Sequence, residues 1–380
     1  MTKESFISAV VGITTFISLF LAFFLVTVKT KNRLSNRLFA FFLLLAVLDL
    51  SGFLFGSQNQ SISNLGLFRN FAVFLQPPTL YLYILSACFA DFKLRPKHAV
   101  HLIPFLLVNL VFVPRFYIQS EEEKIRLLQN FKQVFEIQVN HTFFHIIVLA
   151  YLIACFLILR KVKRLYLENY AGANIKSYYW LFQLTVAISI FFGLALIKNI
   201  FKFSVFYDFS EAIRIGLFVF QLVIICWYLF KALNHPDLFR NLNSRLKLVE
   251  TLLSEEKSNP NPDSDGQNTN DAVSRLKQYM VEEKPFLNPS LTVQTLSEEI
   301  EIPARELSIL INHRIGQHFF DFINSYRIQS AVDILKDPSK KEVTVLEILY
   351  EVGFNSKSSF NTAFKKHTGF TPTAYRSKNS

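Results

Sequence analysis

The sequence predicts an all-α protein that consists of a polytopic helical membrane bundle and a smaller helical domain. Three observations lead to this fold class. Apolar runs of membrane-spanning length fill the chain as far as residue 234, a polar stretch follows, and a helix–turn–helix pattern occurs twice near the end. We therefore expect a membrane domain at 1–234, an amphipathic helix with a flexible linker at 235–271, and a domain with two helix–turn–helix units at 272–380.

The composition supports this division. Of the 380 residues, 51% are hydrophobic, 42 are Phe and 18% are charged, whereas a soluble protein carries about 25% charged residues. The apolar excess lies almost wholly before Asn234, and much of the formal net charge of +11 sits in short loops between the apolar runs. Cys88, Cys155 and Cys226 each fall inside an apolar run, so we expect small buried side chains rather than disulfides.

Seven apolar runs approach the length of about 20 residues that a helix needs to cross a bilayer. They are Phe6–Val28, Leu38–Gly56, Leu67–Ala90, Ala99–Val113, Phe143–Leu159, Tyr179–Ile200 and Ile213–Leu233. The fourth run is the shortest. Pro77 and Pro78 in the third run predict a kink there.

The charges between these runs predict the orientation, because loops rich in Lys and Arg stay in the cytoplasm. The first, third and fifth loops are the basic ones; their cations are Lys29, Lys31, Arg33 and Arg37, then Lys93, Arg95 and Lys97, then Arg160, Lys161, Lys163, Arg164 and Lys176. The loop at 57–64 is uncharged, and the loop at 115–140 balances its cations with acids. We expect a multi-pass protein of the inner (cytoplasmic) membrane, with the N-terminus outside and the C-terminal domain in the cytoplasm.

Two different segments follow the last apolar run. Leu238–Glu256 is charged and amphipathic, with apolar residues at heptad-like spacing; it either pairs two copies into a homodimer or lies on the inner leaflet. Ser258–Asp271 is polar and rich in turn-forming residues. We interpret it as a flexible linker with a mean reach of about 20 Å.

The clearest local pattern lies near the end of the chain. Val345–Val352 has apolar residues at helical spacing, and Gly353 then stops that helix by entering a turn with positive φ. Asn355 or Ser356 supplies an N-cap for a second helix, which ends at Gly369. The apolar face of the second helix comprises Phe360, Ala363 and Phe364.

The same pattern occurs once more upstream. A first helix around Leu296–Ile300, a turn at Glu301 and a second helix at Pro303–Asn312 repeat the arrangement. Between the two units, Phe319–Lys336 reads as one helix, which is about 27 Å long at about 1.5 Å per residue. Two recognition helices held at its ends could enter successive major grooves, about 34 Å apart along DNA.

From about Ala272 to Arg376, the chain resembles the DNA-binding domain of the AraC/XylS family of bacterial transcription regulators. The second unit carries the family signature as Ile348, Val352, Gly353, Phe354, Ser356, Ser358, Phe360, Phe364, Lys365, Lys366, Gly369, Thr371, Pro372, Tyr375 and Arg376. Two positions depart from it: Leu349 replaces the usual alanine, and Glu301 replaces the usual glycine of the first turn. We expect Glu301 to adopt the left-handed conformation at a cost of roughly 1 kcal/mol.

The resemblance implies double-stranded DNA as a partner. For base contacts, the expected residues are Arg305, Ser308, Asn312, Lys357, Ser358, Asn361 and Thr362. For phosphate contacts, they are Lys365, Lys366 and Arg376. The alternative interpretation is that these side chains are only solvated helix faces.

Four ionisable residues lie within the apolar runs, namely Asp49, Arg69, Lys198 and Arg214. By the expected orientation all four fall in the outer half of the membrane. They would form a net-positive cluster able to hold an acidic small molecule or a lipid headgroup. Alternatively, Arg69 and Arg214 reach the outer interface and Asp49 pairs with Lys198.

The sequence contains no P-loop, nucleophile elbow or zinc-protease motif, so we expect neither enzymatic activity nor a cofactor. His98 with His101, and His141 with His145, have the spacing of helical ligand pairs, but no Cys, Asp or Glu stands beside them at ligand spacing. We therefore expect packing rather than metal binding.

The order of parts predicts a membrane-anchored one-component regulator whose membrane domain is a sensor. The alternative is a transporter-like or receptor-like membrane protein whose helical tail is a regulatory or protein-interaction module.

Overall fold

The computed structural model describes residues 3–28, 33–54, 63–89, 91–171, 175–205, 207–234 and 266–379, and every named element within them is a helix. Proximity of the Cα atoms divides the chain into unit 1, Met1–Arg160 with Lys176–Ser244, and unit 2, Lys161–Ile175 with Arg245–Ser380. The amphipathic segment expected at 238–256 lies outside the described residues.

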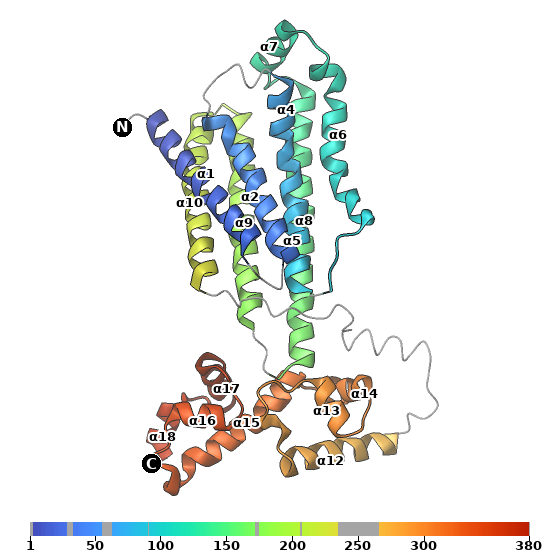
Figure 1. The fold of residues 1–380 in the computed structure, drawn as a ribbon, viewed down its shortest axis with the longest axis vertical. Helices are drawn as coiled ribbons and strands as arrows, with labels where there is room; N and C mark the ends of the chain where they lie inside the picture. The colour runs from blue at the N-terminus through green and yellow to red at the C-terminus, as the bar shows by residue number, and fades with distance from the viewer. Residues whose placement is uncertain are drawn as a thin grey trace. The chain divides into compact units, whose positions relative to one another are not determined.

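Unit 1 is a bundle of long apolar helices (Figure 1). In chain order, its elements are α1 (Lys3–Thr27), α2 (Arg33–Leu54), α4 (Asn64–Phe71), the 3₁₀ turn η1 (Ala72–Leu75), α5 (Gln76–Cys88), the 3₁₀ helix η2 (Pro96–Leu102), α6 (Ile103–Val111), the π turn η3 (Val113–Tyr117), α7 (Glu121–Gln129), α8 (Phe135–Asn169), α9 (Ile175–Lys202) and α10 (Tyr207–Asn234). Helix α1 packs against α2 and α10, and α2 packs against α5. The short helix α7 lies across one end of the bundle (Figure 1).

Six helical segments of the described residues are long and apolar enough to cross a membrane. They are Lys3–Thr27, Arg33–Leu54, Asn64–Cys88, Phe135–Asn169, Tyr178–Lys202 and Tyr207–Lys231. These correspond to six of the seven predicted spans. The remaining one is shorter, an apolar helix at Pro96–Val111, in which the 3₁₀ helix η2 leads into α6 with Pro104 in the first turn of α6.

The two prolines of the third span act at the start of a helix rather than in its middle. The chain leaves α4 through the tightened turn η1, and α5 then begins with Pro77 and Pro78 in its first turn. Proline is tolerated there because the N–H groups of a first helical turn have no intrahelical partner. The expected kink therefore takes the form of a 3₁₀ interruption between two α-helices.

The interior of unit 1 is aromatic, while its outer surface is also apolar. Phe39 and Tyr228 stack with ring centroids 4.2 Å apart, and Trp180 lies 5.0 Å from Tyr228. In contrast to a soluble bundle, large side chains such as Phe16, at 71% exposure, face outward. An outer surface of this kind suits lipid rather than water.

Cys88 and Cys155 are buried as expected, but Cys226 is exposed on α10, so the expectation of burial is wrong for that residue.

Unit 2 contains the two predicted helix–turn–helix units. Its elements are α12 (Gly266–Glu282), the 3₁₀ turn η4 (Pro285–Leu287), α13 (Val293–Glu299), α14 (Ala304–Ile309), the π turn η5 (Leu310–Arg314), α15 (Phe319–Lys336), the 3₁₀ turn η6 (Pro338–Lys340), α16 (Val345–Glu351), α17 (Lys357–Thr368) and α18 (Pro372–Asn379). Helix α12 begins at Gly266, so the last six residues of the predicted linker are helical. The rest of that linker lies outside the described residues.

Helix α15 has the predicted bounds and joins two separate hydrophobic cores. Its first half contributes Phe319, Phe322 and Ile323 to the core that contains α12, α13 and α14. Its second half contributes residues such as Ile328 and Leu335 to the core that contains α16 and α17. Each helix–turn–helix unit therefore has a core of its own on one shared helix.

Candidate nucleic-acid interface

The second helix–turn–helix unit is defined by a chain of local signals. Thr344 caps α16 in a reciprocal box with Glu347: Thr344 Oγ1 accepts from Glu347 N at 3.2 Å, and Glu347 Oε2 accepts from Thr344 N at 2.7 Å. The hydrogen bonds between Thr344 and the Glu347 carboxylate, first the one from Thr344 N, hold the pKa of Glu347 below its ordinary value. Ser356 is the N-cap of α17, and Gly369 ends it with φ +80°. Both ends of α17 are therefore set by residues that the pattern predicts.

Gly353 makes the turn possible for two reasons. Its φ is +86°, a conformation that glycine adopts without steric cost. A Cβ placed on it would also lie 2.6 Å from the carbonyl oxygens of Phe286 and Leu287 in η4. The turn of the second unit thus packs its backbone directly on the first half of the domain, which the signature glycine alone did not reveal.

Helix α17 has one buried face and one polar, basic face. Phe360, Ala363 and Phe364 are buried. Of the residues expected to read bases, Lys357, Ser358 and Thr362 are exposed and Asn361 is half-buried. They lie at positions i, i+1, i+5 and i+4, which places them on one side of the helix together with Lys365 at i+8. The twelve residues of α17 include basic side chains and no acid.

The three expected phosphate-contacting residues differ in their surroundings. Lys365 is exposed. Lys366 Nζ lies 2.6 Å from Asp321 Oδ1 on α15, so this lysine is held in an ion pair. Arg376 donates from Nη2 to the Val343 carbonyl oxygen at 2.6 Å. The structure therefore uses Arg376 to tie α18 to the segment before α16.

The first unit follows the pattern less closely. Glu301 has φ +58°, as expected for the residue that replaces the turn glycine. Arg305 is exposed on α14, but Ser308 is only 5% exposed, so its expected outward orientation is wrong. Asn312 is half-buried, and its Oδ1 accepts from Phe319 N at 3.1 Å. Asn312 therefore holds the start of α15, and its Nδ2 donates to Ser308 Oγ at 3.3 Å.

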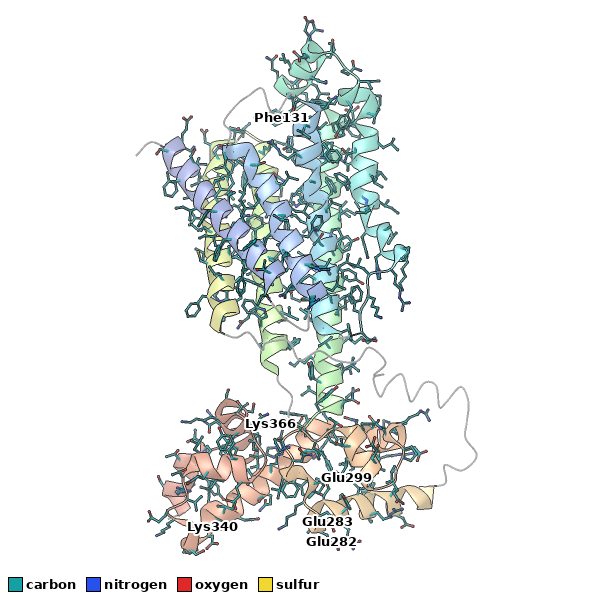
Figure 2. All side chains as sticks on the ribbon, viewed as in Figure 1. Phe131, Glu282, Glu283, Glu299, Lys340 and Lys366 are labelled. Carbon is teal, nitrogen blue, oxygen red and sulfur yellow. The ribbon has the colours of Figure 1, made fainter. Side chains whose placement is uncertain are left out.

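Acidic side chains accompany the first unit. Glu282, Glu283 and Glu299 lie on the α12 and α13 side of unit 2, whereas Lys366 lies on α17 (Figure 2). Anionic side chains oppose the approach of phosphate, and cations favour it. The charge distribution of unit 2 therefore favours the second recognition helix over the first.

The sequence interpretation missed Arg327, the largest fully buried side chain of the described residues. Its Nε donates to the Phe286 carbonyl oxygen at 2.6 Å, its Nη2 donates to that of Asn288 at 2.8 Å, and its guanidinium carbon lies 5.4 Å from the Phe354 ring centroid. Burial lowers the pKa of Arg327 to about 10. No sequence signal marks it, since an arginine in the middle of an amphipathic helix ordinarily faces water.

In unit 1, the four expected ionisable residues come together around one cavity. Asp49, Arg69, Lys198 and Arg214 all line it. Arg214 also forms an ion pair with Glu211 on its own helix. Lys202 and His141 line the same cavity and were not among the residues expected there.

The histidine pairs engage in packing and hydrogen bonds. His145 Nε2 lies 2.9 Å from Asn199 Nδ2, and His101 Nδ1 lies 2.7 Å from Tyr151 Oη. Within the part of the chain that the structure describes, no group of three or more His, Cys, Asp or Glu is placed to hold a metal ion.

The comparisons with known proteins concern unit 2. Residues 296–378 match the family model described as a helix-turn-helix domain. Over 90 residues the chain is 28% identical to the uncharacterized HTH-type transcriptional regulator YdeC of Bacillus subtilis (strain 168), a match that covers 24% of this chain and 30% of that protein. Over 93 residues it is 29% identical to the uncharacterized transcriptional regulatory protein YesN of the same organism, covering 24% and 25%. The chain thus spans less than a third of the length of these curated relatives.

A solved structure, the C-terminal domain of AraT, a response regulator from Geobacillus stearothermophilus, is 30% identical in sequence with a TM-score of 0.25. The matched region covers 28% of this chain and 84% of the chain of that solved structure. The C-terminal part of the protein is an AraC-type DNA-binding domain of a transcriptional regulator, which follows several long apolar helices.

Proposed function

Given an AraC-type domain behind a set of membrane-spanning helices, we propose that the protein is a membrane-anchored one-component transcription regulator. Unit 2 binds promoter DNA in a sequence-specific manner, and unit 1 senses a signal and anchors the protein. A change in unit 1 alters how well two copies of unit 2 occupy adjacent DNA sites. Leu238–Glu256 is the proposed pairing segment.

The observation that carries the proposal is the solvent face of α17. Lys357, Asn361 and Lys365 share one side of a helix whose opposite side is locked into a core by two phenylalanines. Asn pairs with adenine through two hydrogen bonds, and Lys approaches guanine or phosphate. A rigid helix with these side chains can enter a major groove without rearranging the domain. On the first unit, Arg305 is the remaining candidate for a base contact.

The proposed orientation depends on whether Pro96–Val111 crosses the membrane. With seven residues in the 3₁₀ helix η2 at about 2.0 Å each and nine in α6 at about 1.5 Å each, the segment extends about 27 Å. The hydrocarbon core of a bilayer is about 30 Å thick. A seventh crossing together with the basic odd-numbered loops places the N-terminus outside and unit 2 in the cytoplasm.

DNA binding is tested with the full-length protein in lipid nanodiscs and sites selected from a random DNA library. Lys365→Ala should weaken binding to all sequences alike and reduce the salt dependence by about one phosphate contact. Asn361→Ala should instead change the preferred base at one position, by about 1–3 kcal/mol. Lys277→Ala, which removes an exposed lysine from α12, is the matched control and should leave binding unchanged. Wild-type binding by both α17 variants would refute the assignment.

Orientation and sensing need tests of their own. Green fluorescent protein fused after Ser380 should fluoresce, because it folds in the cytoplasm, whereas alkaline phosphatase at the same place should be inactive. In cells, expression of a reporter gene placed under a selected DNA site should differ between cells that make the full chain and cells that make the fragment 266–380. Identical reporter output from both would remove the sensory role and leave only the DNA-binding one.

A further inference from the structure

Unit 1 encloses a cavity of about 620 Å³, a volume typical of small-molecule sites. Helices α2, α4, α8, α9 and α10 supply much of its wall. Phe131 lies at the end of unit 1 that α7 covers (Figure 2) and also lines the cavity. The wall is strongly aromatic; its phenylalanines are Phe53, Phe71, Phe74, Phe112, Phe116, Phe131, Phe144, Phe191, Phe192 and Phe218. A ligand of this cavity therefore needs an apolar body.

The charged groups of the cavity are mostly cationic. Arg69, Lys198, Lys202 and Arg214 face one acid, Asp49, which interacts electrostatically with Lys198 and Arg69. Glu211, which pairs with Arg214 on the same helix, is a second carboxylate beside these groups. Four cations against two carboxylates leave a surplus of two positive charges in an aromatic cavity. An uncompensated charge in such surroundings is costly, and an anion that enters the cavity offsets that cost.

Several polar atoms around the cavity are buried without a hydrogen-bond partner. They are Arg69 Nε, Arg214 Nε, Asn140 Oδ1 and Asn199 Oδ1. A buried polar atom without a partner costs about 1–3 kcal/mol, so a ligand that supplies partners is stabilised there. The two amide oxygens accept hydrogen bonds and match a hydroxyl or N–H group. Two of the four are guanidinium donors, which match a carboxylate or phosphate oxygen.

Gly52 makes room for one of these donors. A Cβ on Gly52 would lie 2.9 Å from Arg69 Nη2. The guanidinium of Arg69 therefore lies close against α2, beside the cavity, and a side chain at position 52 would displace it.

An apolar groove between α8 and α9 adjoins the cavity. This groove has a volume of about 810 Å³ and shares His141, Phe192 and Asn199 with the cavity. Along α8 it extends from Gln138 to Phe156, about 27 Å at about 1.5 Å per residue. That is close to the thickness of the hydrocarbon core, about 30 Å. The groove therefore has the length and the apolar lining that an extended alkyl chain requires.

We propose that unit 1 binds an anionic amphiphile, with its acidic head among Arg69, Lys198 and Arg214 and its alkyl chain in the groove between α8 and α9. The shared chemistry is one acidic group on a long alkyl chain, either a free fatty acid or an anionic phospholipid of the bilayer. That this ligand is the signal rests on the proposed sensory function; the binding itself does not.

Binding is measured with the full-length protein in nanodiscs of neutral phosphatidylcholine. One arm adds radiolabelled palmitate, and a second arm replaces part of the lipid with phosphatidylglycerol and detects retained lipid by native mass spectrometry. Hexadecanol competes as a chain of the same length without the charge, and acetate as the charge without the chain. Retention of either anionic amphiphile, with weak competition by hexadecanol and by acetate, supports the proposal. The arm that shows retention identifies the source.

Variants test the two halves of the site separately. Lys198→Gln should weaken binding about tenfold or more by removing a cation from the enclosed site. Gly193→Leu should do the same by filling the groove, since an added Cβ at Gly193 meets no atom within 4 Å and the side chain can enter free space. Arg126→Gln removes a cation from α7 that pairs with Glu123 and does not line the cavity. It is the matched control and should bind as the wild type does.

The proposal is overturned if the wild type retains neither amphiphile, if Lys198→Gln or Gly193→Leu binds as tightly as the wild type, or if hexadecanol or acetate competes as well as palmitate. A dimer held together through the groove without lipid would also overturn it. DNA binding by the same nanodiscs is measured in parallel. If the wild type does not bind DNA, the proposed function is contradicted. If it binds DNA but retains neither amphiphile, only this inference is contradicted.

Discussion

Replacing Gly353 by alanine tests whether the turn glycine acts through its backbone conformation alone or also through close packing. At φ +86°, an alanine costs about 1–2 kcal/mol relative to glycine. Its Cβ would in addition lie 2.6 Å from the Phe286 and Leu287 carbonyl oxygens. The Phe286 carbonyl cannot move freely, because it accepts a hydrogen bond of 2.6 Å from Arg327 Nε. Strain of this kind adds about 1–3 kcal/mol, so the free energy of unfolding should fall by about 2–5 kcal/mol.

Two other glycines provide matched controls. Gly369 has φ +80° and Gly316 has φ +74°, but an added Cβ at either position meets no atom within 4 Å. Gly369→Ala and Gly316→Ala should therefore lose only the conformational part, about 1–2 kcal/mol.

The assay is urea unfolding of the fragment 266–379, followed by circular dichroism after wild-type fragment has been shown to be helical and to unfold cooperatively. The unfolding free energies of the three variants are compared in one buffer. Equal losses for Gly353→Ala and Gly369→Ala would refute the reasoning, because the contact with η4 would then contribute nothing.

Three further changes have distinct expected outcomes. Arg327→Met should lower the unfolding free energy of the same fragment by about 1–3 kcal/mol for each buried carbonyl oxygen left unpaired, and a loss below 1 kcal/mol in urea unfolding would contradict the buried anchor. Because hydrogen bonds from Thr344 lower the pKa of Glu347 in the folded state, their stabilisation is present above its ordinary value of 4.5 and is lost as pH falls through the lowered folded value. The unfolding free energy of the wild type should therefore fall more steeply below that pH than that of Glu347→Gln, which keeps the acceptor without the charge; parallel pH curves would argue against this. Asp321→Asn releases Lys366 from its ion pair and should tighten DNA binding severalfold at low salt with a stability change below about 1 kcal/mol; fluorescence anisotropy at two salt concentrations checks it, and unchanged affinity would mean that Lys366 contacts no phosphate.

The second helix–turn–helix unit shows how much local sequence determines. Capping oxygens at Thr344 and Ser356, and glycines at 353 and 369, act through the conformation of their own backbone and of the neighbouring turn. Such signals are readable without knowledge of distant residues. The same holds for α15, whose predicted bounds are those observed.

The presence of the long apolar helices was also largely decided locally, because length and hydropathy determine whether a segment can span a bilayer. Their ends were predicted less well: the run predicted at Phe143–Leu159 lies within α8, Phe135–Asn169. Pro96–Val111 falls short of that criterion. Its first seven residues form the 3₁₀ helix η2, whose rise per residue is greater than that of an α-helix, and Pro104 then lies in the first turn of α6. Rise per residue depends on the observed backbone and was not predictable from the apolar pattern.

Sequence by itself determined the all-helical class, the repeated helix–turn–helix pattern and the outward face of α17, since each depends on residues within a few positions of one another. Tertiary structure alone decided the burial of Ser308 and Arg327, the approach of Gly353 to η4, and the gathering of Arg69, Lys198, Lys202 and Arg214 around one cavity. These features depend on which side of each helix meets its neighbours, and a rotation of one residue, about 100°, moves a side chain from the interior to the surface.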